Sequence, residues 1–124
     1  MKIIIKGIPY KVILFSNVEF IKVHSDASVA MHVGTRELHF REDHIKKNVI
    51  IHEVTHAFIN SLCLGSCSNI SLEDFEEIIC ELMEDHLMDI NRISNEILTY
   101  LKDTKALRNK KRKKAKKWLN HLDG

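Results

Sequence analysis

The chain has 124 residues, of which 44% are apolar and 29% are charged, and its formal net charge is +2. This length supports one domain with a modest core, and the composition is that of an ordinary globular protein rather than a disordered or fibrous one. No apolar run approaches the roughly 20 residues of a membrane-spanning helix, so a membrane protein is not expected.

The cysteines and the N-terminal residues indicate a compartment. Cys63, Cys67 and Cys80 are odd in number, which argues against a disulfide framework and for a reducing environment. The apolar N-terminus is interrupted by Lys6 and Lys11 and is followed by no small-residue cleavage site, unlike a signal peptide. We therefore expect a cytoplasmic protein.

The first third of the chain favours strands. Residues 3–5 and 10–15 are short β-rich runs around Gly7-Ile8-Pro9, and they predict an opening hairpin or an extended arm with one turn. Residues 18–23 fit either a third strand or a short helix. Residues 29–33 and 36–41 flank Gly34-Thr35 and predict a second hairpin.

The remainder favours helices. A first helix is expected from Asp43 or His44 to Leu62, closed by residues 64–66. A second helix is expected to begin at Ser71, where Asp74 three places on completes a capping box.

No Gly or Pro occurs between Gly65 and Gly124, so all residues after Ser71 could be helical. A helix of that length rarely stays unbroken in a small domain, and we place a break in the polar cluster 91–95. Strands followed by helices predict an α+β fold, with a small antiparallel sheet packed against the helices. Residues 1–102 are expected to form the domain, and residues 103–124 a helical, basic C-terminal extension.

The first helix contains His52-Glu53-Val54-Thr55-His56. Residues four apart share a helical face, so both imidazoles can bind one metal ion, and Glu53, about 100° round the helix, can reach a water on that ion. This is the H-E-x-x-H pattern of zinc hydrolases, in which the Glu is a general base. The alternative is a pair of core histidines bonded to carbonyl groups, with an exposed Glu.

The neighbouring residues extend this pattern. Val49, three places before the first His, the uncharged Val54 and Thr55 between the ligands, and Phe58, two places after the second His, resemble the zincin metallopeptidases. The resemblance covers residues 29–90 and is closest to minimal gluzincins of the ImmA/IrrE-like and phage-encoded kinds. It implies a minimal zincin fold, in which the motif helix and a second, ligand-bearing helix pack on the sheet.

The resemblance also implies a third zinc ligand. Gluzincins carry it as a Glu about twenty residues further on, and Glu77-Ile78-Ile79-Cys80-Glu81 fits that pattern. Glu77 would then be the ligand, and Glu81 the outer carboxylate that orients a ligand imidazole. Two alternatives stay open: another carboxylate of this acidic stripe, such as Glu73 or Glu84, or a merely solvated helix face.

The function implied by this resemblance is that of a zinc-dependent metallopeptidase acting on an intracellular protein. Zn²⁺ is the cofactor, a zinc-activated water is the nucleophile, and Glu53 is the general base. Zincins also pack an antiparallel strand beside the metal helix, and its edge pairs with the extended substrate; residues 36–41 are the candidate edge. A residue that stabilises the transition state is expected among Tyr100, His86, His121 and His39, and the sequence does not choose between them.

Charge is unevenly distributed along the chain. Residues 1–101 hold 9 Lys and Arg against 15 Asp and Glu, whereas residues 102–124 hold 10 against 2. The basic tail could make weak contact with nucleic acid or an acidic partner, or it could be a solvated helix end. The rival hypothesis is therefore an accessory protein of zincin fold that binds metal without turnover and uses this tail for its partner.

Overall fold

The computed structural model describes residues 1–24, 30–33, 36–62 and 71–122, with only the backbone given for residues 31–33. Strands β1 (Lys2–Ile5) and β2 (Ile8–Phe15) form the predicted opening hairpin. Residues 18–23 prove to be helical, within α1 (Asn17–Val23). Strands β3 (Ala30–Val33) and β4 (Glu37–Arg41) form the second antiparallel pair, as predicted.

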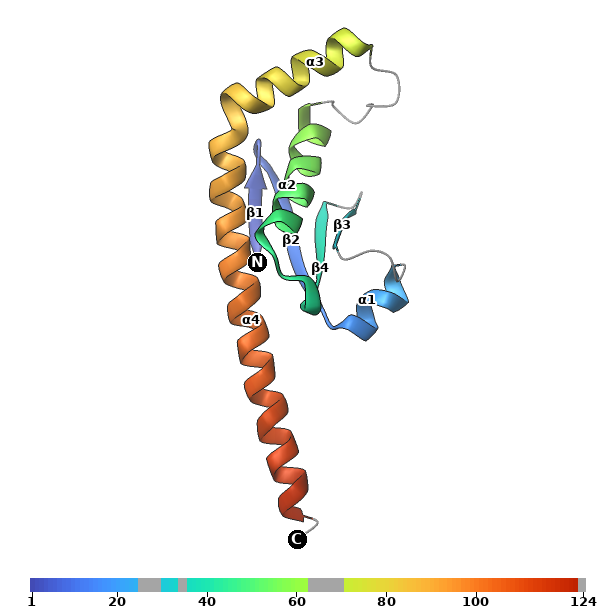
Figure 1. Cartoon of the computed structure of the whole chain (residues 1–124), viewed down its shortest axis with the longest axis vertical. Coiled ribbons are helices and arrows are strands. Elements are labelled where there is room, and N and C mark those ends of the chain that lie inside the picture. The colour runs from blue at the N-terminus through green and yellow to red at the C-terminus, as the bar shows by residue number, and fades with distance from the viewer. Residues whose placement is uncertain (25–29, 34–35, 63–70, 123–124) are drawn as a thin grey trace.

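The four strands join into one sheet in the order β1-β2-β4-β3 (Figure 1). The prediction of a purely antiparallel sheet is wrong at one pairing, because β2 and β4 run parallel. The reason is that β3 carries the chain back against the direction of β2, so β4 returns alongside β2 in the same direction. The prediction that residues 36–41 form a sheet edge is also wrong. Strand β4 is bonded on both sides, and the edges are β1 and β3.

The helices follow the strands. A 3-10 turn, η1 (Glu42–His44), precedes α2 (Lys47–Leu62), so the first helix begins later than predicted. Its expected closure at residues 64–66 lies outside the described residues. Helix α3 (Leu72–Glu81) begins as predicted, since the Ser71 hydroxyl accepts a hydrogen bond from the Asp74 backbone N–H at 3.1 Å.

A π-helical turn, η3 (Leu82–His86), leads into α4 (Leu87–Leu122), a single helix of 36 residues. The predicted break at residues 91–95 is wrong. The polar cluster is the solvent side of an unbroken helix, where Arg92 pairs with Glu96 at 3.1 Å, while Ile93 and Ser94 face the core. The chain changes direction instead around η3, between α3 and α4 (Figure 1).

The core lies on one face of the sheet, under α2 and α4. Side chains that alternate along each strand point into it, as expected for a half-covered sheet. The buried residues of the strands are Ile3, Ile5, Tyr10, Val12, Leu14, Ala30, Leu38 and Phe40. Those of the two helices are Ile50, Val54, Ala57, Phe58, Ile90, Ile93, Ile97 and Leu101. Helix α1 covers part of the opposite face, where Phe20 packs on Phe15 with ring centroids 6.2 Å apart.

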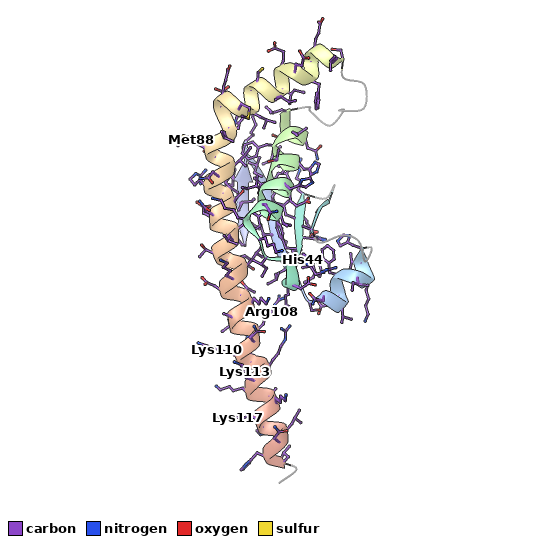
Figure 2. All side chains as sticks on the ribbon, viewed as in Figure 1. His44, Met88, Arg108, Lys110, Lys113 and Lys117 are labelled. Carbon is purple, nitrogen blue, oxygen red and sulfur yellow. The ribbon has the colours of Figure 1, made fainter. Side chains whose placement is uncertain are left out.

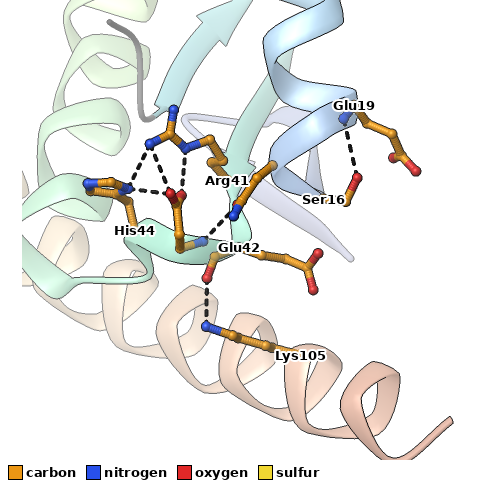
Figure 3. A network of polar contacts seen from close by, with 8 residues as sticks. Ser16, Glu19, Arg41, Glu42, His44 and Lys105 are labelled. Carbon is orange, nitrogen blue, oxygen red and sulfur yellow. Dashed lines mark hydrogen bonds and ion pairs between the residues drawn. The ribbon is translucent and has the colours of Figure 1, made fainter. Parts of the chain in front are cut away.

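Helix α4 continues past the core, and its Lys and Arg side chains hydrogen-bond to the rest of the domain. The Lys105 Nζ donates to the Glu42 carbonyl oxygen at 2.9 Å (Figure 3), and an Arg108 N–H donates to the Leu14 carbonyl oxygen at 2.9 Å. Arg112 forms a two-pronged pair with the buried Glu42 carboxylate, at 3.0 and 3.1 Å. Residues beyond the expected division at 102 therefore contact the domain.

An ion pair in the turn η1 is expected to make the stability of the protein depend on pH. Arg41 hydrogen-bonds Asp43, which lowers the pKa of the Asp43 carboxyl from 3.8 to about 2 (Figure 3). A carboxyl with a lowered folded-state pKa contributes stability that is present above pH ~4 and is lost as the pH falls toward 2. We predict that Asp43→Asn removes part of the decline in unfolding free energy over this range, measured by urea denaturation.

Asp103→Asn, at an exposed position of α4, is the matched control and should decline like the wild type. Because the Asp43 side chain is 38% exposed, the effect is expected to be modest. Equal declines for wild type and Asp43→Asn would contradict the assignment.

Candidate metal centre

The two histidines of the motif lie together on the exposed side of α2. The Nε2 atoms of His52 and His56 are 3.1 Å apart, and the two rings are nearly perpendicular, with an interplanar angle of 78°. A tetrahedral zinc ion with Zn–N bonds of about 2.0–2.1 Å places two ligand nitrogens about 3.3 Å apart. The pair is thus close to the spacing that two zinc ligands require.

The protonation of the pair follows from this contact. In a direct hydrogen bond one ring donates its Nε2–H and the other accepts through a lone pair. Binding of a metal ion requires both Nε2 atoms to be unprotonated, so the ion and the shared proton are mutually exclusive occupants.

The imidazoles open onto a surface depression of about 440 Å³. Its lining residues are Asn48, Ile51, His52, Thr55, His56 and Ile59. The Thr55 hydroxyl donates to the Ile51 carbonyl oxygen at 2.7 Å, so its proton is used within the helix. The imidazoles are therefore the accessible nitrogen donors of a concave site with room for a ligand.

Glu53 has the opposite environment. It is 7% exposed, and its side chain takes part in an interaction with a neighbouring group. The alternative drawn from the sequence, buried histidines beside an exposed Glu, does not describe this helix, because the exposures are reversed. Glu53 is not among the residues that line the depression, so its role as general base stays a prediction.

The structure does not bring the two acidic candidates to the histidines. Glu77 is exposed on α3, which makes at most slight contact with α2. Glu81 lies 3.7 Å from the Lys6 ammonium and 3.8 Å from His86. Among the residues that the structure describes, no three His, Cys, Asp or Glu side chains form a group that could hold a metal ion. The roles of Glu77 as third ligand and of Glu81 as orienting carboxylate stay predictions.

The four candidates for transition-state stabilisation lie in different surroundings. His86 is nearly buried and its ring contacts Phe58 of α2, with centroids 5.4 Å apart. Tyr100 packs at the edge of the core, and His121 is exposed near the end of α4. His39 is buried on the sheet face opposite to α2. His86 is the candidate with a direct ring contact to the motif helix.

A second histidine pair was missed by sequence reasoning. His24 Nε2 lies 3.0 Å from His39 Nδ1, and His39 Nε2 lies 3.2 Å from a Glu37 carboxylate oxygen. Burial, and secondly the charge of His39, lower the pKa of His24. No spacing pattern could have revealed this group, because the packing of α1 on β4 brings it together.

Comparison with protein-family models, with curated proteins and with solved structures gives no match to this chain. Within the described residues, no helix is long and apolar enough to cross a membrane.

Zinc content tests the histidine pair. We predict that the wild type, purified without added metal and then titrated with zinc, binds about one ion per chain, measured by mass spectrometry and calorimetry. His52→Ala and His56→Ala should each weaken binding by more than the ~10–100-fold that loss of an outer hydrogen-bond partner costs. His121→Ala, an exposed helical histidine remote from α2, is the control. Unchanged affinity in both α2 variants would rule the pair out as ligands.

The same assay locates the third ligand. Glu77→Ala is compared with Glu73→Ala, a second exposed carboxylate of α3. A loss as large as for the histidine variants, seen for Glu77 alone, would assign it as a ligand. An unchanged zinc affinity would remove Glu77 from the site.

Proposed function

We propose that the chain is a zinc-dependent metallopeptidase that hydrolyses peptide bonds of a protein substrate. The observation that carries this proposal is the His52–His56 pair, with Nε2 atoms 3.1 Å apart at a solvent-accessible depression and Glu53 next to them in the chain. The resemblance of residues 49–58 to the zincin motif supports the same conclusion.

His52 and His56 would hold the ion through Nε2. A bound Zn²⁺ would polarise the scissile carbonyl and lower the pKa of water at the site to about 7. Glu53 would accept a proton and deliver it to the leaving amine, the work of a general base that then acts as an acid. Its buried carboxylate is shielded from bulk water, so its interaction with a charged neighbour is screened less than at the surface.

The sheet edge provides a place for the substrate. Strand β3 is antiparallel to β4, lies at the edge of the sheet and packs against α2 (Figure 1). An edge strand offers unpaired backbone N–H and C=O groups that an extended peptide can pair with. We therefore assign to β3 the substrate-pairing role expected for residues 36–41, with its specificity open.

Glu53→Gln tests the proposed role of the carboxylate. We predict that this variant keeps the zinc affinity of the wild type and loses about 10²–10⁴-fold in hydrolysis rate, because a general base contributes that much. The probes are fluorescein-labelled casein and a quenched-fluorescence peptide library, assayed with and without a zinc chelator. Glu96→Gln, on the exposed side of α4, is the control for the same chemical change.

Thermal unfolding of Glu53→Gln is measured alongside, since the residue is buried. Equal hydrolysis by wild type and a folded, zinc-loaded Glu53→Gln would show that this carboxylate is not the base. Zinc-loaded wild type that cleaves neither probe would instead favour the rival, an accessory protein that binds metal without turnover.

A further inference from the structure

Two oppositely charged surfaces lie at opposite ends of α4. The first, the acidic face, comprises residues 72–89, which contain eight Asp and Glu and no Lys or Arg. An exposed apolar row runs along it: Leu72 is 73% exposed, and Met88, near the start of α4 (Figure 2), is 86% exposed. The other members of the row are Phe75, Ile79, Met83 and Leu87. Among the residues that the structure describes, no element covers this row, and an exposed apolar row of this length marks an interaction surface.

The second surface, the basic end, comprises residues 110–122 of α4. Lys110, Lys113, Lys114 and Lys117 follow the spacing of one helical face. By the same spacing Lys105, Arg108 and Arg112, which bind the domain, fall on the opposite side of the helix. Trp118, Leu119 and Leu122 form an exposed apolar cluster beside them, with Trp118 63% exposed. The basic end is therefore amphipathic, like the acidic face, and of opposite charge.

The two surfaces cannot meet within one chain. Both extend onto the rigid helix α4, where Asp89 and Lys110 are 21 residues apart, about 32 Å at 1.5 Å per residue. Figure 1 shows α3 at one end of α4 and the C-terminus at the other. Each surface is therefore open to a partner from outside the chain.

We propose that the basic end of one chain docks on the acidic face of a second copy. In a closed two-fold dimer with antiparallel α4 helices, both contacts form at once, and each buries the apolar residues of both surfaces. Opposite charges around the apolar rows would fix the register and speed association.

Charge complementarity favours this occupant over a polyanion. Nucleic acid would satisfy the lysines of the basic end, but it would leave the apolar row of the acidic face uncovered. A second copy covers both surfaces with residues that the chain already has.

Sedimentation of the full chain tests the dimer. Variant one is Lys113→Glu with Lys117→Glu, and variant two is Glu76→Lys with Asp85→Lys, all at exposed positions that are not among the candidate ligands. We predict a wild-type dimer whose dissociation constant rises at least tenfold at about 1 M salt, where the Debye length is about 3 Å. Each variant alone should dimerise at least tenfold more weakly.

Mixing the two variants provides the decisive arm. In the mixed dimer the C-terminal end of variant one, which now carries glutamates, meets the face of variant two, which now carries lysines. The other contact joins an unchanged basic end to an unchanged acidic face, as in the wild type. Association should return to the wild-type level, which a general loss of fold or solubility would not produce. Circular dichroism of each variant confirms the helices.

Three outcomes would overturn the proposal. One is a wild type that stays monomeric at low salt, and the second is a dimer that both charge reversals leave unchanged. The third is two weakened variants that do not associate on mixing. A monomeric wild type that binds a single-stranded oligonucleotide, with variant one failing to do so, would assign the lysines to nucleic acid instead.

Discussion

The rest of the structure depends on the packing of the apolar face of α2 against the sheet. Ile50, Val54 and Phe58 are buried against the strands, and each would cost about 1.5–3 kcal/mol to expose. A turn of α2 about its axis by one residue, about 100°, would expose part of this row and bury the imidazoles instead. The apolar face of the sheet therefore determines that His52 and His56 point outward together while Glu53 points inward.

The buried Glu42 helps to fix the position of α2 at its N-terminal end. It lies in the turn that leads into the helix, and its carboxylate accepts hydrogen bonds from Nη1 and Nη2 of Arg112, 70 residues away. A buried charge is costly unless paired, and removal of one partner leaves the other uncompensated. The beginning of the motif helix and the middle of α4 are thus tied together, so the basic residues of α4 are divided between structural anchors and a free outer face.

Local pattern predicted most of the elements but not how they are assembled. The two hairpins, the Ser71 cap and the shared face of His52 and His56 follow from turn residues, capping chemistry and the 3.6-residue period. The parallel pairing of β2 with β4 and the interior place of β4 depend on the path of the chain between strands, which no local pattern encodes. The prediction of a break at residues 91–95 was wrong because, in sequence alone, polar residues on the outer side of a helix cannot be distinguished from those of a polar loop.

The candidate site shows the same division. The pairing of His52 with His56 needs only the helical period, and it is present at 3.1 Å. The position of Glu77 depends instead on packing between helices, and α3 has no buried residue of its own to fix that packing. A helix of ten residues is marginal without tertiary contacts. Whatever covers the apolar row of α3 would therefore also decide where Glu77 lies, so the proposed contact with a second copy and the proposed metal site would be linked through one helix.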